Sequence, residues 1–379
     1  MAWGDGATPL GDRFAVARSL WNGRRGQTYQ GFIKSLMRFG CKPLLGAAAC
    51  LRRHVLAVPE HQHRFGFVAL AVDGSRFDLA RTAGHERVFG VAGKTHSAPQ
   101  MWITTLWHMG LGLPWDWRIG RARASERHHL DMMLEGTPAG ALIVADAGFT
   151  GYELMRTIIM SGREVLLRVG RHVELLRDLG YAEWVDDQTV YLWPAHAQRD
   201  RALPLVLRLV TVRSTGDRRR RVYLLTSVTD RNRLSDEHAA ALYRMRWGVE
   251  LCYRSLKQTL SCRKLRSHAP AQALFEMHGL MLGLMLLGLL SVTQIVSAGH
   301  DPLSWSVACS LRVVRQSMRN NNSDWPSRLS EAVKDTYRRR YKTRRKWPRK
   351  KQTDPPPGKP RVRPATLQEV ELAMRLQTI

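Results

Sequence analysis

Two apolar runs of strand length, each leading into an aspartate, mark the first half of the chain. The first, Phe65 to Val72, leads into Asp73-Gly74-Ser75, and the second is Ala141 to Asp146. A continuous apolar run of this length is typical of a strand buried on both faces. Because Asp-Gly is a turn signal, we expect the first strand to end at Asp73. A second strand through Phe77 and Leu79 would then complete a hairpin.

Further strands and helices follow from the same kinds of pattern. In residues 171–222, apolar runs divided by polar and charged turns predict a β-rich insertion. The expected strands are Met101 to Trp107, Glu164 to Val169, Val190 to Trp193, Leu203 to Val212 and Arg219 to Leu225. The expected helices are residues near 12–58, a segment starting at Ser125, Tyr152 to Met160, and a segment starting at Ser235 that reaches Tyr243.

One long apolar segment, Met277 to Gly299, contains no Asp, Glu, Lys or Arg. It is long enough to span a bilayer. However, it stands alone in the chain and contains His278 and several glycines, which favours a helix in the core of a folded domain. We therefore expect a core helix and no membrane partner, with a transmembrane span as the alternative.

Composition narrows the class of protein. The 379 residues include 59 Lys and Arg against 32 Asp and Glu, which gives a net charge of +27. This imbalance suits a polyanionic partner, nucleic acid first. The five cysteines are odd in number and form no C-x-x-C pair, so a disulfide framework and a structural zinc site are both disfavoured. The N-terminal sequence lacks the pattern of a secretory signal, and a reducing cytoplasm fits best.

Two basic segments carry interleaved aromatic residues. Residues 23–39 are either a helical support or a DNA-binding head, and no helix-turn-helix signature decides between these interpretations. Residues 334–351 contain one acidic residue among many Lys and Arg. Such a run is often simply solvated. In a chain this basic, nonspecific contact with phosphates is the preferred interpretation.

The segment from Tyr243 to Lys257 is predicted to be helical because it has no Pro and a single Gly. At about 100° per residue, Tyr243, Arg246, Glu250 and Lys257 fall within roughly 60° of one another on the helix. Arg246 and Glu250 are four residues apart and can support each other. One face therefore presents a hydroxyl, two cations and a carboxylate.

Asp73, Asp146 and Glu250 together offer three oxygen donors from separate elements. Such ligands suit Mg²⁺ or Mn²⁺. Two such ions about 4 Å apart can activate a nucleophile and stabilise the leaving oxygen of a phosphodiester. Arg246 and Lys257 would then hold phosphates of the DNA.

Other residues complete the set of candidates. Tyr243 would donate to a phosphate or stack on a sugar, and Trp247 and Arg254, on the same helix, are further candidates for DNA contact. Asp78 and Asp116 compete with Asp73 for the first acidic position. Asp73 is preferred because a buried strand presents it.

The spacing Tyr-x2-Arg-x3-Glu-x6-Lys from Tyr243 to Lys257 resembles the YREK signature of the insertion sequence 4 family of bacterial DDE transposases. VDGS at Val72 to Ser75 is similar to the motif of the first catalytic aspartate, and ADAGF at Ala145 to Phe149 to that of the second. LLTSVTD before the helix and LRSHAP after it also resemble the family. The resemblance covers about residues 65–295, and three motifs recur in order.

This resemblance implies an α/β fold: an RNase H-like mixed sheet flanked by helices and interrupted by a β-rich insertion. It divides the chain into an N-terminal helical region (1–62), two parts of a catalytic core (63–170 and 223–300), the insertion (171–222) and a basic C-terminal region (301–379). Asp73, Asp146 and Glu250 would be both the catalytic residues and the metal ligands. Many relatives pass through a DNA hairpin, some with a flipped base stacked on an aromatic residue in or near the insertion, and Tyr223 lies where we expect that residue.

The implied function is Mg²⁺-dependent cut-and-paste transposition. Water would cleave the phosphodiester at the end of the element, and the freed 3′-hydroxyl would attack target DNA. The implied partner is double-stranded DNA, at both inverted-repeat ends and target, with a homodimer in the synaptic complex at the nucleoid. The alternatives are an inactive or domesticated copy that only binds DNA, and a structure-selective nuclease on the same fold.

Overall fold

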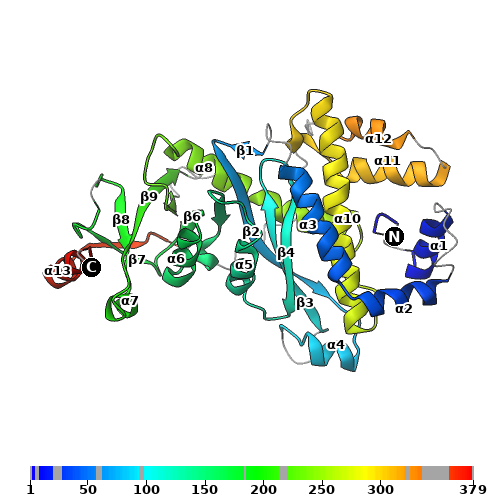
Figure 1. The fold of residues 1–379 in the computed structure, drawn as a ribbon, viewed down its shortest axis with the longest axis horizontal. Helices are drawn as coiled ribbons and strands as arrows, with labels where there is room; N and C mark the ends of the chain where they lie inside the picture. The colour runs from blue at the N-terminus through cyan, green and yellow to red at the C-terminus, as the bar shows by residue number, and fades with distance from the viewer. Residues whose placement is uncertain are drawn as a thin grey trace, which may run out of the picture. The chain divides into compact units, whose positions relative to one another are not determined.

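The computed structural model describes residues 2–4, 8–19, 28–56, 62–93, 98–182, 185–213, 221–320, 324–334 and 358–377 (Figure 1). The chain forms two compact units, and each unit is assembled from two separate segments. Unit 1 comprises Met1–Ala141 and Met245–Lys334, and unit 2 comprises Leu142–Arg244 and Asp335–Ile379.

Unit 1 contains an antiparallel sheet with its strands in the order β1-β2-β3-β4. The strands are β1 (His63–Arg64), β2 (Phe67–Asp78), β3 (Gln100–His108) and β4 (Leu113–Arg121). Its helices are α1 (Leu10–Ser19), α2 (Tyr29–Phe39), α3 (Lys42–Leu56), α4 (Ala83–Val88), α5 (Glu126–Leu134), α9 (Trp247–Arg254), α10 (Pro270–Ser297), α11 (Val307–Asn320) and α12 (Trp325–Arg328). Short 3₁₀ turns, η4 (Pro302–Ser304) and η5 (Leu329–Glu331), follow α10 and α12.

The helical N-terminal region and the helix after Ser125 are confirmed, and Ser125 caps α5 by accepting from the amide of His128.

The predicted hairpin at Asp73-Gly74-Ser75 is wrong. β2 continues without a break through these residues, and its pairing with β3 runs in one register from Leu70 to Asp78. Gly74 serves close packing here instead of a turn. A Cβ at this position would lie 2.1 Å from Glu126 Oε1 and 2.6 Å from a ring carbon of Trp102. Contacts from distant parts of the sequence therefore explain the glycine.

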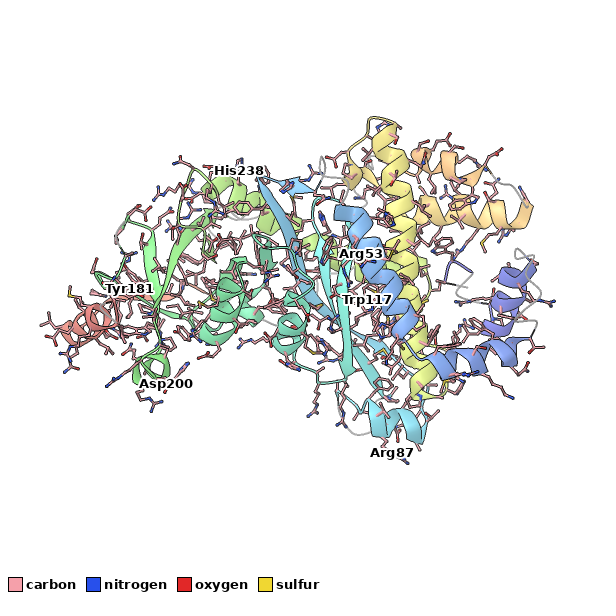
Figure 2. The ribbon with its side chains drawn as sticks, viewed as in Figure 1. Arg53, Arg87, Trp117, Tyr181, Asp200 and His238 are labelled. Atoms are coloured by element: carbon pink, nitrogen blue, oxygen red, sulfur yellow. The ribbon has the colours of Figure 1, made fainter. Side chains whose placement is uncertain are left out.

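The long apolar helix is α10, which begins with Pro270 at its first turn. It contacts α3, β4 and α11, and it is tied to the sheet where Trp117 Nε1 donates to His278 Nδ1 at 2.9 Å (Figure 2 labels Trp117). It is the one helix in the described ranges long and apolar enough to cross a membrane, yet half of its most apolar window is buried inside the chain. Such a helix by itself is weak evidence for a membrane, and this burial agrees with the predicted core helix.

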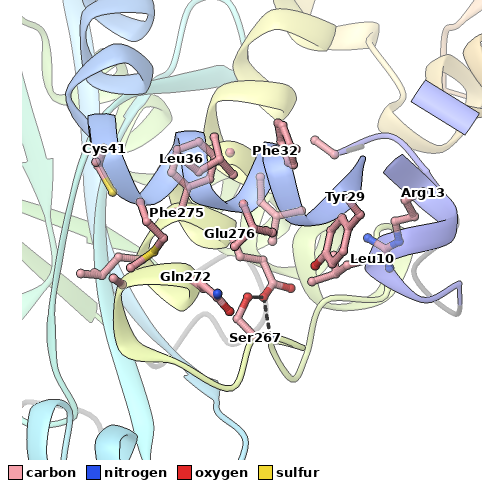
Figure 3. Close-up of a pocket in the computed structure, with 18 residues that line it drawn as sticks. Leu10, Arg13, Tyr29, Phe32, Leu36, Cys41, Ser267, Gln272, Phe275 and Glu276 are labelled. Atoms are coloured by element: carbon pink, nitrogen blue, oxygen red, sulfur yellow. Dashed lines mark hydrogen bonds between the residues drawn. The ribbon is translucent and has the colours of Figure 1, made fainter. Parts of the chain in front are cut away.

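An apolar cavity of about 360 Å³ lies between α1, α2 and α10 (Figure 3). Phe32 and Leu36 of α2 face Phe275 of α10 across it. At its edge, the carboxylate of Glu276 accepts hydrogen bonds from the amide and the hydroxyl of Ser267, at 2.9 and 2.7 Å. These bonds fix the LRSHAP segment at the start of α10.

Unit 2 contains a mixed sheet with its strands in the order β11-β7-β8-β9-β10-β6-β5. The pairs β5–β6 and β11–β7 are parallel, and the other pairs are antiparallel. The strands are β5 (Leu142–Ala145), β6 (Glu164–Val169), β7 (Glu174–Arg177), β8 (Thr189–Leu192), β9 (Leu205–Arg213), β10 (Arg221–Thr226) and β11 (Arg361–Pro364). The helices are η2 (Ala147–Phe149), α6 (Tyr152–Met160), α7 (Ala195–Arg199), α8 (Asp236–Met245, whose last residue belongs to unit 1) and α13 (Leu367–Gln377).

The strands expected in the insertion are confirmed, and so is the α/β class, with sheets flanked by helices. Because β10 pairs with β6, the strands of the insertion extend the sheet that β5 and β6 begin. Tyr223 lies on β10 opposite Val169.

The C-terminal segment joins unit 2 through β11 and α13. Arg363 donates to Glu174 at 2.8 Å and forms a pair of bonds, 2.8 and 2.9 Å, to the carboxylate of Glu369. The expected basic C-terminal region is thus divided, with residues 301–334 in unit 1 and β11 and α13 in unit 2. Residues 335–351 of the predicted phosphate-binding run lie outside the described residues, as do residues 23–27 of the N-terminal basic segment.

Candidate active site

Strand β2 presents the first candidate carboxylate, Asp73, from its middle. The side chain of Asp73 is 22% exposed, so the strand buries most of it without closing it off from solvent. Its Oδ1 accepts from the amide of Gly74 at 2.9 Å, and its Oδ2 lies 3.8 Å from Nη1 of Arg246. A half-buried carboxylate requires such compensation, because an unpaired charge removed from water is costly.

Helix α9 presents the second carboxylate, Glu250. Arg246 immediately precedes this helix, and its Nη2 donates to Glu250 Oε1 at 3.2 Å, the expected spacing of four residues. Only 12% of the Arg246 side chain is exposed. One guanidinium group therefore contacts both Asp73 and Glu250, which are 177 positions apart in the sequence.

The predicted continuous helix from Tyr243 to Lys257 is wrong in detail. α8 ends at Met245, α9 starts at Trp247, and residues Ser255–Thr259 form a π-helical turn, η3. Arg246 itself keeps helical dihedral angles, with φ −49° and ψ −31°. The π turn changes the direction of side chains beyond Arg254, which a constant 100° per residue does not anticipate.

Lys257, within this π turn, lies over the same face of β2 as Asp73. Its Nζ donates to Ser75 Oγ at 2.7 Å and lies 4.9 Å from the centroid of the Phe77 ring. Burial lowers the pKa of the Lys257 ammonium, and Asp78 opposes that shift. A cation is thus held two residues along the strand from Asp73.

The other candidates lie at the surface or in unit 2. Trp247 is 52% exposed on α9, an unusual exposure for so large an apolar side chain, and Arg254 is exposed on the same helix. Asp146 follows β5 and accepts from the amide of Gly148 at 2.8 Å, which caps a 3₁₀ turn. Tyr243 is half-buried on α8.

The structure thus brings Asp73, Arg246, Glu250 and Lys257 together within unit 1, whereas Asp146 and Tyr243 belong to unit 2.

The two competing aspartates have structural partners. Asp116 is 4% exposed and pairs with Arg52 and Arg118 at 3.2 and 3.0 Å. Asp78 accepts from the side chain of Gln100 at 2.8 Å. These contacts give Asp116 and Asp78 a place in the packing of unit 1, whereas Asp73 contacts the same arginine, Arg246, as Glu250 does.

The family described as "Transposase DDE domain" matches residues 64–286, more than half of the chain. The chain belongs to this family. The matched range contains Asp73, Asp146 and Glu250, and it confirms the resemblance to DDE transposases that the motifs predict.

Two similar proteins are also transposases by name. "Transposase InsG for insertion sequence element IS4" of Escherichia coli (strain K12) is 27% identical over 295 residues, which cover 73% of this chain and 64% of that protein. This chain therefore spans less than two thirds of that relative's length. A cryo-EM structure of the piggyBac transposase synaptic complex with hairpin DNA shares 13% identity with a TM-score of 0.41, over 71% of this chain and 58% of that one.

The residues of this DDE domain suit a hard divalent cation in their chemistry. Asp73 and Glu250 offer carboxylate oxygens from two elements, and both side chains are partly exposed. Across the described parts of the chain, no group of three or more His, Cys, Asp or Glu residues is arranged so that it could hold a metal ion. Asp73 and Glu250 are therefore a pair within unit 1, and a third ligand remains a prediction.

Sequence reasoning missed Ser75 and Tyr253 in this DDE domain. Ser75 accepts from Lys257, and the hydroxyl of Tyr253 donates to the main-chain oxygen of Asp73 at 2.8 Å. The alternation of strand side chains is a signal for Ser75, since Asp73 and Ser75 must face the same side of β2. No comparable signal exists for Tyr253, because its partner is a main-chain atom.

Proposed function

We propose that this chain is a DNA transposase in which Asp73, Asp146 and Glu250 are the catalytic carboxylates. The observation that carries the proposal is the contact of one arginine, Arg246, with both Asp73 and Glu250 inside a matched transposase DDE domain. Carboxylates that come from distant parts of the sequence and lie near one another can hold the divalent ions used in phosphoryl transfer. Asp146, at the end of β5 in the same matched range, would be the third carboxylate.

The proposed cofactor is Mg²⁺ or Mn²⁺, with two ions held by these carboxylates. When bound, such ions polarise the phosphodiester and make water or a hydroxyl a stronger nucleophile. The protein itself supplies orientation: Arg246 and Lys257 lie beside Asp73 and would hold the phosphates that flank the scissile bond. Trp247 and Arg254, exposed on α9, and Tyr243 would contact the DNA strand, and the charge of +27 would attract it.

The substrate we propose is the pair of inverted-repeat ends of an insertion sequence, followed by target DNA. The relative InsG is named as the transposase of insertion sequence element IS4, and cut-and-paste transposition by a homodimer at the nucleoid would be the corresponding activity here. Cleavage at the element end would free a 3′-hydroxyl, which then attacks the target.

The test is an assay of cleavage and strand transfer. A linear DNA that carries the sequences flanking the gene is incubated with the protein and a separate target plasmid. We expect the wild-type chain to cut at the element end and to insert the cut end into the plasmid when Mg²⁺ or Mn²⁺ is present. Glu250→Gln should abolish both steps while DNA affinity is retained. Asp78→Asn is the matched control, because Asp78 is an aspartate on the same strand that pairs with Gln100, and it should stay active.

Three results would contradict the proposal. Retained cleavage by Glu250→Gln would exclude this carboxylate from the chemistry. Cutting of branched DNA without strand transfer would identify a structure-selective nuclease. Binding without cleavage by the wild-type chain would identify a copy that only binds DNA.

A further inference from the structure

A buried tyrosine, Tyr253, connects the helix that carries Glu250 to the strand that carries Asp73. It lies on α9, three residues after Glu250, and is 5% exposed. Its hydroxyl donates to the main-chain oxygen of Asp73 at 2.8 Å, and the main-chain oxygen of Ile103 lies 3.2 Å from the same hydroxyl. One side chain of α9 therefore contacts the main chain of both β2 and β3 beside the candidate active site.

The ring of Tyr253 is also held in place. It packs edge-on against Phe77, with 6.5 Å between ring centroids and 64° between the planes, and Phe77 is fully buried. Phe77 and Asp73 are four residues apart on β2, so their side chains point to the same face. The ring cannot shift along β2 without disturbing Phe77, and its hydroxyl is therefore fixed at Asp73.

The hydroxyl of Tyr253 donates to main-chain carbonyl oxygens of two strands, since Asp73 belongs to β2 and Ile103 to β3. These contacts and the packing of its ring against Phe77 give Tyr253 a geometric function beside Asp73.

We propose that Tyr253 is a positioning residue for the DNA cleavage proposed above, on which this inference rests. Its hydroxyl fixes the main chain at Asp73 relative to Glu250, so that the two carboxylates can meet one divalent ion. A phenylalanine at this position would keep the packing against Phe77 but would lose the bond to Asp73. The substitution would therefore change the position of the Asp73 carboxylate relative to Glu250 and would change the fold little.

The experiment compares the wild-type chain with Tyr253→Phe and with Tyr191→Phe as the matched control. Tyr191 is also buried, and its hydroxyl also bonds to the main chain, accepting from the amide of Ala182 at 3.3 Å. It belongs to unit 2, whereas Asp73 and Glu250 belong to unit 1. For each chain, Mn²⁺ affinity is measured by calorimetric titration without DNA. The kcat of Mn²⁺-dependent end cleavage, the Kd for DNA and the thermal unfolding midpoint are measured alongside.

We expect Tyr253→Phe to bind Mn²⁺ about 10-fold more weakly, the lower end of the range for losing a partner that orients metal ligands. We also expect its kcat to fall by about 10- to 100-fold, because small misplacements of reacting groups are costly. Its DNA affinity should match that of the wild-type chain, and Tyr191→Phe should match the wild-type chain in Mn²⁺ affinity, kcat and DNA affinity.

The outcomes separate this inference from the proposed function. If the wild-type chain cleaves DNA and Tyr253→Phe binds Mn²⁺ as the wild-type chain does, Tyr253 does not position the carboxylates. The same conclusion follows if both variants lose equal kcat and equal thermal stability, because the effect is then general. If the wild-type chain does not cleave, the proposed function is wrong and the positioning role falls with it.

Discussion

Replacing Gly74 by alanine tests the packing that keeps β2 straight at Asp73. The added Cβ would lie 2.1 Å from Glu126 Oε1 and 2.6 Å from a ring carbon of Trp102. The Glu126 carboxylate is the end of a flexible side chain and can move. The indole of Trp102 is more constrained, because its Nε1 donates to Thr104 at 3.2 Å and Arg76 lies 4.5 Å above the ring. The strain must therefore be absorbed by the strand or by the indole.

The expected cost follows from two opposing effects. Overpacking of this kind typically costs about 1–3 kcal/mol. Replacing glycine with alanine reduces the entropy of the unfolded chain and returns about 0.4–1 kcal/mol. With central values of about 2 kcal/mol for the overpacking and about 0.7 kcal/mol for the entropy, we expect Gly74→Ala to be destabilised by about 1.3 kcal/mol. This corresponds to a thermal midpoint lower by roughly 3–5 °C, at about 2–4 °C per kcal/mol for domains of 150–250 residues.

The assay is thermal unfolding followed by circular dichroism, with Gly279→Ala as the matched control. Gly279 lies inside α10, and a Cβ there would meet nothing within 4 Å. Alanine in a helix interior is favoured over glycine by about 1 kcal/mol, so Gly279→Ala should raise the midpoint. If the Gly74→Ala chain is as stable as the wild-type chain, the packing explanation for Gly74 is refuted.

Two further predictions concern the C-terminal segment and the DNA interface. Bonds from Arg363 hold the pKa of Glu369 at about 2, below its usual 4.5, so the carboxylate stabilises the fold above pH 4.5 and this contribution is lost as pH falls toward 2. The stability difference between the wild-type chain and Glu369→Gln in urea unfolding should therefore shrink over that interval, and a constant difference would exclude the ion pair as its cause. Trp247→Ala should weaken DNA binding by about 1–3 kcal/mol in fluorescence anisotropy. Because Trp247 is 52% exposed, the variant should keep its stability within about 0.5 kcal/mol, and unchanged DNA affinity would remove Trp247 from the interface.

Local patterns are sufficient for the elements whose signal lies within a few residues. α6 and β6 have the bounds that their apolar spacing predicts, and Asp146 directly follows β5 as expected. The signature from Arg246 to Lys257 identifies residues that the structure brings beside Asp73. In these cases, the burial of one apolar face and the regular geometry of the backbone determine where the element lies.

The features that local patterns miss depend on partners far away in the sequence. Asp-Gly predicts a turn at Gly74, but Glu126 and Trp102 occupy the space that the missing side chain leaves. The strand β11 pairs in parallel with β7, almost two hundred positions earlier, and its own four residues carry no sign of that partner. Tyr253 escapes notice because its partner is a main-chain oxygen. Tertiary packing decides all three.

In the proposed site, Asp73 and Glu250 bind a divalent ion together. Calorimetric titration of Mn²⁺ into the full chain tests this binding most directly, with the variants Asp73→Asn and Glu250→Gln and the control Asp78→Asn. We predict that each of the first two substitutions weakens Mn²⁺ binding by at least about 10-fold, since each removes a carboxylate ligand. Asp78→Asn should bind Mn²⁺ as the wild-type chain does. Equal Mn²⁺ affinity in all four chains would contradict the claim and leave the contacts of Arg246 as ordinary ion pairs.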